Sequence, residues 1–279
     1  MPFAQTADGT SVYYETHGEG PAVVLVHGSG GHHAAWWQQV AELSRRYTVV
    51  TLDLRGFGRT SDAAAAVDLS EGLDAGLFPG DILAVLHDAG IRRAVLAGQS
   101  IGAVAALRAA LAEPELVAGV VLAHSLGGIS DPELSPLVAA DRAEAVKLPV
   151  LDRLLTRAFR ETDPAKTFLF RQMGTFNRAK MQDLRNLDSD GPTVAEINAS
   201  GIPIYFLAGA DDAVLSGKTV TRAAELLDNA HLDLVPDAPH AMYWEKPELF
   251  NAALDRFLQL AYPEHAEHAP TATEETVTA

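Results

Sequence analysis

Residue types that can perform nucleophilic catalysis occur in this 279-residue chain in the order serine, aspartate, histidine. The serine is Ser100, which lies between Gly98 and Gly102 in the segment G-Q-S-I-G. This segment follows an apolar run and precedes a helix-like run, the context in which a sharp strand-to-helix turn exposes a serine hydroxyl. A bare G-x-S-x-G is common in ordinary turns, and Ser100 would also serve as a plain helix N-cap. The neighbouring elements must therefore decide its role.

An acid and a base follow two later apolar runs. Asp211 and Asp212 come after residues 203–208, and His240 comes after residues 231–235. Because the carboxyl ends of parallel strands open at one edge of a sheet, these side chains are expected beside Ser100. An ionised aspartate can orient an imidazole that takes the proton of a serine. We therefore predict a catalytic triad whose acid is Asp211 or Asp212.

Backbone donors for an oxyanion are expected in two places. The segment H-G-S-G-G, which includes Ser29, follows residues 23–26, and the Ile101 amide opens the helix after Ser100. The N–H groups of Ser29 and Ile101 are the predicted oxyanion hole. A simple glycine turn or a phosphate cradle are the alternatives, but the segment matches neither G-x-G-x-x-G nor a P-loop.

The elements that would position these residues alternate along the chain. Apolar β-branched runs are typical of a parallel sheet, and the stretches between them read as crossover helices. The predicted strands are 23–26, 48–52, 94–97, 119–123, 203–208 and 231–235, and the predicted helices are 36–46, 81–89, 101–112, 219–228 and 247–260. Residues 3–6 and 11–15 flank an Asp-Gly turn and predict an antiparallel hairpin at the edge. The expected fold class is α/β, with a mostly parallel eight-stranded sheet flanked by helices.

The alternation stops in the middle of the chain. Residues 127–200 lack strand-like runs and predict a helical lid inserted into a core made of 1–126 and 201–262. Residues 263–279 are rich in Glu, Thr, Ala and His, and we expect a disordered acidic tail.

Composition excludes several classes of partner. The formal net charge is −16 and the pI is about 4.9, so the overall field repels nucleic acid and anionic membranes. There is no cysteine, which excludes disulfides and thiolate sites. The N-terminus lacks the pattern of a secretory signal, and we expect a cytoplasmic protein; the sequence makes no prediction of oligomeric state.

These motifs also carry a family resemblance. In type, order and spacing the chain resembles the α/β-hydrolase superfamily over about residues 3–260, at His27-Gly28, Asp53–Thr60, Gly98–Gly102, Gly209–Asp212 and Pro239-His240. The resemblance implies a serine hydrolase without cofactor or metal. The resemblance selects Asp212, three residues after the glycine, as the acid, although Asp211 stays an alternative. It also implies that Asp53 and Arg55 belong to a structural turn and have no catalytic role. Ala103 and Pro239 stand where glycines are usual, which leaves the subfamily unassigned.

The substrate is predicted less sharply. Aromatic residues in the insertion and near the site loops favour a small-molecule substrate, a medium-sized apolar or aromatic carbonyl compound. The expected pocket residues are Gly28, Trp37, His124, Phe170 and Trp244. We interpret His32, His33 and His124 as pocket-lining or solvent-facing, and expect no metal site because no ligand spacing is familiar.

Three functions compete. The leading one is an ester or lactone hydrolase that works through an acyl-enzyme. The second is a carbon–carbon hydrolase acting on a vinylogous diketone, because His27–Gly30 and Trp244-Glu245 look like segments of ring-cleavage-product hydrolases; Arg171 or Arg178 would then bind a carboxylate. The third is a ligand receptor or a biosynthetic cyclase on the same fold. Epoxide hydrolysis and dehalogenation are disfavoured, since their nucleophile is an aspartate.

Overall fold

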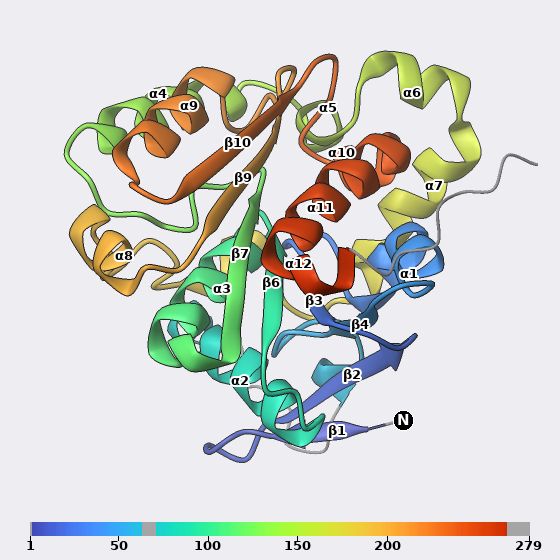
Figure 1. Ribbon diagram of the computed structural model, residues 1–279. Helices are drawn as coiled ribbons and strands as arrows, with labels where there is room; N and C mark the ends of the chain where they lie inside the picture. Colours follow the sequence, from blue (N-terminus) through green and yellow to red (C-terminus); the bar gives the residue numbers. More distant parts are fainter. Residues whose placement is uncertain (1, 63–70, 267–279) are drawn as a thin grey trace, which may run out of the picture.

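The computed structural model describes residues 2–62 and 71–266 (Figure 1). Its main sheet has eight strands in the order β1-β2-β4-β3-β6-β7-β9-β10. These strands are β1 (Phe3–Gln5), β2 (Ser11–His17), β3 (Ala22–Val26), β4 (Thr48–Leu52), β6 (Ala94–Gln99), β7 (Val117–Ala123), β9 (Ile204–Gly209) and β10 (Ala230–Val235). A second, two-stranded sheet pairs β5 (Leu73–Asp74) with β8 (Leu184–Arg185).

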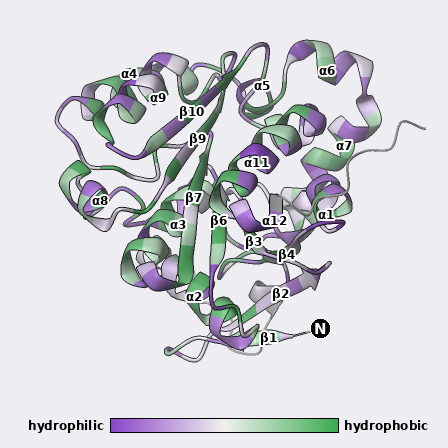
Figure 2. Ribbon diagram, in the orientation of Figure 1, coloured by the Kyte–Doolittle hydropathy of each residue, from purple (hydrophilic) through white to green (hydrophobic). Residues whose placement is uncertain are grey.

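Strand direction follows the sequence prediction. The hairpin strands β1 and β2 pair antiparallel, β2 pairs antiparallel with β4, and every other neighbour in the main sheet is parallel. Every residue of β3, β6 and β7 is buried, as expected for central strands covered on both faces. Figure 2 shows apolar colouring along β6 and β7 in the middle of the molecule. The predicted α/β class and eight-stranded sheet are confirmed.

Helices cover both faces of this sheet (Figure 1). They are α1 (Trp37–Leu43), α2 (Phe78–Asp88), α3 (Ile101–Ala112), α4 (Leu134–Ala145), α5 (Val150–Leu154), α6 (Arg157–Thr162), α7 (Pro164–Met173), α8 (Val194–Ser200), α9 (Gly217–Leu226), α10 (Met242–Glu245), α11 (Pro247–Ala261) and α12 (Pro263–Ala266). Short 3-10 turns are η1 (His33–Trp36), η2 (Gly58–Asp62), η3 (Ala75–Leu77), η4 (Pro114–Leu116), η5 (Gly174–Phe176) and η6 (Met181–Asp183).

Two hydrophobic cores result from the alternation of side chains along the strands. Val24 of β3 packs in the core that α2, α3 and α9 cover. Its neighbours Val23 and Leu25 pack in the opposite core, with α1 and α11. The sheet, packed on both faces, therefore fixes the positions of the loops at its carboxyl edge relative to one another.

The stretch between β7 and β9 contains five helices, α4 to α8, and the short strand β8. Ile197 of α8 is buried in the core with α2, α3 and α9, so the last helix of this stretch packs against the sheet. Whether the stretch opens and closes as a lid stays a prediction.

The end of the chain differs from the prediction. Residues 263–266 form α12, and the His265 imidazole lies 2.8 Å from the Arg46 carbonyl oxygen. The predicted disorder is wrong for these four residues because they dock on the loop before β4, and residues 267–279 lie outside the described ones. No helix within residues 2–62 and 71–266 is both long and apolar enough to cross a membrane.

Candidate active site

Ser100 occupies a strained turn between β6 and α3. Its backbone has φ 54° and ψ −118°, a conformation that side-chain-bearing residues rarely adopt. The flanking glycines are required by space. A Cβ at Gly98 would lie 2.3 Å from the Gly102 carbonyl oxygen, and one at Gly102 would lie 2.4 Å from the Val26 carbonyl oxygen. The motif therefore encodes close packing of the α3 N-terminus on β3 as well as the turn itself.

The strain at Ser100 makes a stability prediction. Glycine adopts this mirror-image extended conformation freely, so Ser100→Gly should raise the free energy of unfolding by about 1 kcal/mol, the strain relieved less the entropy cost of glycine. Urea denaturation measures this difference. Ser100→Ala keeps the Cβ and should gain nothing; equal stabilisation of both variants would show that the backbone is not the cause.

The glycine loop after β3 lies beside this turn. Strands β3 and β6 are parallel neighbours with Val26 opposite Gly98, and the loop turns back through a hydrogen bond from the Gly31 amide to the Gly28 carbonyl, 3.0 Å long. Ser29 is half-buried, and Ile101 is the first residue of α3. Both predicted oxyanion donors thus lie just beyond the ends of adjacent strands.

His27 holds the loop in place. Its Nε2 accepts a hydrogen bond from the Leu54 amide at 3.1 Å, so its Nδ1 carries the proton and donates to the Gly28 carbonyl at 2.8 Å. Burial lowers the pKa of His27 to about 4. It is therefore a neutral structural residue at the start of the loop.

Gln99 is a residue of this region that the sequence analysis missed. A Cβ at Gly28 would lie 2.0 Å from the Gln99 Oε1, and the Gln99 Nε2 donates to the His240 carbonyl at 3.4 Å. The variable position of G-x-S-x-G therefore connects the glycine loop, residues 27–32, to the histidine loop, residues 236–241. No sequence signal marks it, because the x position has no fixed residue type.

Asp212 and His240 form a buried pair at the same edge. The His240 Nδ1 lies 2.9 Å from Asp212 Oδ2 and 3.1 Å from Oδ1. The amides of Val214 and Leu215 donate to Oδ1 at 2.7 and 3.1 Å. Adjacent Asp211 is exposed, so of the two candidate acids it is Asp212 that meets the histidine. Strand pairing of Gly209 with Val235 sets the two loops side by side.

The Asp212 carboxyl is held ionised. Burial opposes its ionisation, but the His240 charge and hydrogen bonds from His124 and His240 outweigh burial and hold the pKa of Asp212 well below its usual range. An acceptor-only carboxylate fixes the proton of a bonded imidazole on the nitrogen that faces it. The His240 Nδ1 is therefore protonated and its Nε2 is the basic atom.

His124 contacts the predicted acid. The sequence predicts that it lines the pocket or faces solvent; its side chain has no exposed surface, so it does not face solvent, and its Nδ1 lies 3.0 Å from Asp212 Oδ2. His124 directly follows β7, and its φ of 53° lies in the left-handed region. This backbone conformation turns the side chain toward Asp212 in the loop between β9 and α9. The contact joins residues 88 positions apart, so no sequence spacing signals it.

His32 and His33, which the sequence predicts to line the pocket or face solvent, both have hydrogen-bond partners in the structure. His32 is buried, and its Nδ1 accepts from the Ala34 amide at 3.3 Å. The His33 Nδ1 lies 2.8 Å from the Oδ1 of buried Asp53, which also accepts from the Arg59 amide. Asp53 therefore organises the turn after β4, and its expected structural role agrees with these bonds.

Potential metal ligands come together in two groups of the described residues. They are His32, His33 and Asp53, and His124, Asp212 and His240, each with ligand atoms within 4.8 Å of one another. Sequence spacing did not predict either group, because tertiary contacts form both. Hydrogen bonds between members already use the carboxylates, and we assign no metal to either group.

The predicted aromatic pocket residues lie together. The Trp244 ring is buried, 5.4 Å from the Phe170 ring and 6.3 Å from the Trp37 ring, between centroids. Trp37 is 45% exposed. Arg171 and Arg178, the predicted carboxylate binders, are both exposed. These three aromatic rings join α1, α7 and α10 next to the histidine loop.

Hydrogen bonds fasten the inserted stretch to the site loops. Buried Asn177 donates to the Gly31 carbonyl at 2.9 Å and accepts from the Gly58 amide at 3.0 Å. Near the histidine loop, the Glu245 carboxylate accepts from the Thr156 amide and hydroxyl at 2.8 and 2.6 Å. Glu245, part of the resemblance to carbon–carbon hydrolases, thus holds the inserted stretch through Thr156.

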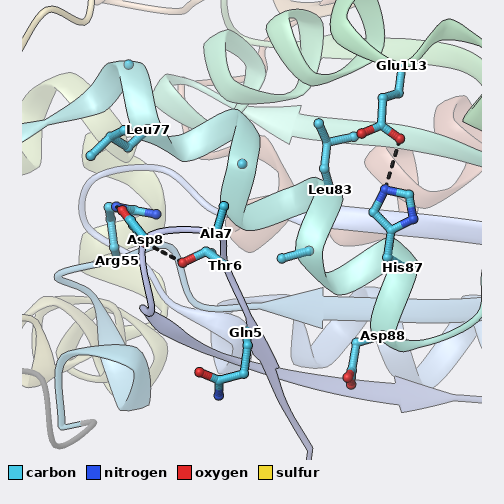
Figure 3. Close-up of a pocket in the computed structure, with 13 residues that line it drawn as sticks. Gln5, Thr6, Ala7, Asp8, Arg55, Leu77, Leu83, His87, Asp88 and Glu113 are labelled. Atoms are coloured by element: carbon cyan, nitrogen blue, oxygen red, sulfur yellow. Dashed lines mark hydrogen bonds and ion pairs between the residues drawn. The ribbon is translucent and has the colours of Figure 1, made fainter.

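Two open hollows lie on the described surface. Figure 3 shows the larger, about 660 Å³, between the hairpin turn at Asp8 and α2, where His87 pairs with Glu113. Neither Ser100 nor His240 lines it. The smaller, about 440 Å³, lies between α4 and the loop 212–216, and Asp212 is on its wall.

Known proteins resemble this chain over most of its length. Residues 23–253 match the family model described as "Alpha/beta hydrolase family". A candidate carbamate hydrolase of Agrobacterium fabrum, RutD, is 26% identical, over 88% of this chain and 98% of that protein. A pimeloyl-[acyl-carrier protein] methyl ester esterase of Aliivibrio fischeri is 27% identical, over 89% and 98%.

Solved structures agree on the fold. A thermophilic esterase from Thermogutta terrifontis superposes with a TM-score of 0.76 at 22% identity, covering 93% of this chain and 98% of that one. The enol-lactonase from Burkholderia xenovorans superposes with a TM-score of 0.74 at 23% identity, covering 92% and 100%.

Proposed function

Because the chain belongs to the alpha/beta hydrolase family, we propose that it is a serine hydrolase of carboxylic esters or lactones, with Ser100 as nucleophile. One observation carries the proposal: the buried Asp212–His240 pair lies at the sheet edge where the strained Ser100 turn also lies. In this assignment His240 is the general base and Asp212 the acid that orients it.

The acylation step depends on a His240 imidazole that is protonated on Nδ1 and basic at Nε2. The basic Nε2 of His240 takes the Ser100 proton as the hydroxyl oxygen attacks the carbonyl carbon. Asp212 stabilises the imidazolium that forms. The protonated Nε2 then gives its proton to the leaving alkoxide, and the acyl group stays on Ser100.

Water completes the cycle. His240 takes a proton from water, which attacks the acyl carbon, and the Ser100 oxygen leaves with that proton. The Ser29 and Ile101 amides would stabilise the oxyanion in both steps, each donor contributing roughly 3 kcal/mol. The Ile101 amide also benefits from the positive end of α3, a helix of 12 residues.

The proposed substrate is a medium-sized apolar or aromatic ester or lactone. The exposed Trp37 ring and the half-buried Phe170 ring, which both pack against buried Trp244, support an apolar binding surface next to the histidine loop. The names of the relatives, a carbamate hydrolase and a methyl ester esterase, support hydrolysis of a carbonyl compound and differ in the bond. We therefore place ester or lactone cleavage first and carbon–carbon cleavage second.

The test of the nucleophile is intact mass after exposure to a fluorophosphonate. One adduct on the wild-type protein and none on Ser100→Ala is the expected result. If neither protein formed an adduct, the result would favour the ligand receptor or the biosynthetic cyclase.

The test of the bond is a panel of aryl esters, alkyl esters, lactones and a coloured dienoate, followed by absorbance. Turnover of esters or lactones that Ser100→Ala loses supports the proposal. Turnover of the dienoate alone would support the carbon–carbon hydrolase instead.

A further inference from the structure

We propose that His124 is a positioning residue of the proposed triad: its Nδ1–H shares Asp212 Oδ2 with His240 and so sets how strongly Asp212 holds the proton of His240. This inference rests on the proposed function and deepens it.

The hydrogen-bond pattern fixes the chemical state of His124. Asp212 Oδ2 accepts from both imidazoles, at 3.0 Å from His124 Nδ1 and 2.9 Å from His240 Nδ1. An ionised carboxylate only accepts, so His124 must carry its proton on Nδ1. Its Nε2 is buried without a hydrogen-bond partner among the described residues. Burial lowers the pKa of His124, so this second histidine is neutral at pH 7.

A neutral donor on a carboxylate has a defined effect. It stabilises the negative charge of Asp212 and so weakens the pull of that charge on a proton held by His240. Removing the donor strengthens this pull, and His240 then stays protonated up to a higher pH. Since only neutral His240 can accept the Ser100 proton, the acidic limb of activity should move to higher pH.

Other charged groups face the same loop, and they do not change in the test. Asp141 and Glu144 of α4 and Lys147, which follows that helix, line the hollow next to Asp212, and Asp141 accepts from the Ser216 amide. Asp211 is the exposed neighbour of Asp212 on its own loop. Each is present in the wild type and in every variant, so a difference between variants at position 124 reports the His124 donor.

Two substitutions separate the donor from the ring. The amide nitrogen of His124→Asn occupies nearly the position of the imidazole Nδ1 and keeps the donor, and asparagine tolerates the φ of 53°. His124→Phe keeps the planar ring and loses the donor. Thermal unfolding of both proteins shows whether each folds.

The expected result is a shift that depends on pH. For His124→Phe, the acidic limb of kcat/KM moves up by about one pH unit, which is a ten-fold loss on that limb and little loss on the plateau. For His124→Asn, the profile stays close to wild type. A merely structural role would instead lower kcat/KM by one factor at every pH.

A spectroscopic readout keeps the inference independent of activity. Histidine Nδ1 protons bonded to a carboxylate give resonances downfield of the amides in proton NMR. We expect two in the wild type; the one from His240 should remain in both variants, moving in His124→Phe and staying in place in His124→Asn. Identical profiles and identical His240 resonances in the two variants would overturn the inference. If the wild-type protein formed no fluorophosphonate adduct, the proposed function would be overturned, and the NMR result would still be interpretable.

Discussion

Replacement of Ser100 by alanine is expected to lower kcat by roughly 10⁶-fold, about 8 kcal/mol of transition-state stabilisation. The physical reason is that the acyl-enzyme cannot form without the hydroxyl, while the Asp212–His240 pair stays bonded and unused. Initial-rate kinetics on the best ester of the panel measures the loss. Folding should be unaffected, because alanine keeps the backbone constraint of the turn.

A second serine provides the matched control. Ser29 would act through its backbone N–H, so Ser29→Ala keeps the oxyanion donor and should retain kcat within a few-fold of wild type. If Ser29→Ala lost as much activity as Ser100→Ala, the side-chain hydroxyl of Ser29 would be taking part and the assignment of the nucleophile would have to change.

Replacement of Asp212 by asparagine is the second large effect, with an expected loss of about 10⁴-fold in kcat. The amide group of asparagine can present N–H to the His240 Nδ1, which moves the imidazole proton to Nε2. That tautomer cannot accept the Ser100 proton. The backbone donors from Val214 and Leu215 still find the asparagine Oδ1, so the loop should keep its shape.

Asp211 is the control for this prediction. It is adjacent in sequence but exposed, and solvent screens an exposed charge. Asp211→Asn should therefore retain kcat within about two-fold. Initial-rate kinetics of the two variants measures both losses. A large loss of kcat in Asp211→Asn together with a small loss in Asp212→Asn would reverse the assignment of the acid.

The sequence by itself determined the fold and the order of the chemical groups. Apolar runs such as 94–97 and 119–123 have the composition of buried parallel strands, and the structure places β6 and β7 there. The G-x-S-x-G segment specified the turn at Ser100, because only glycine leaves room at positions 98 and 102. These features are local, and local steric and hydrophobic preferences can be read from neighbouring residues.

Only the tertiary structure decided which distant side chains meet. Asp211 and Asp212 have the same chemistry one position apart; the family resemblance favoured Asp212 and left Asp211 as an alternative, and the direction of the loop after β9 brings Asp212 to His240. The sequence predicted that His124 lines the pocket or faces solvent, and it is the pairing of β7 with β9 and a left-handed backbone that place it on the same carboxylate. Contacts of this kind depend on how strands far apart in sequence pack together, and neither residue type nor spacing along the chain records that packing.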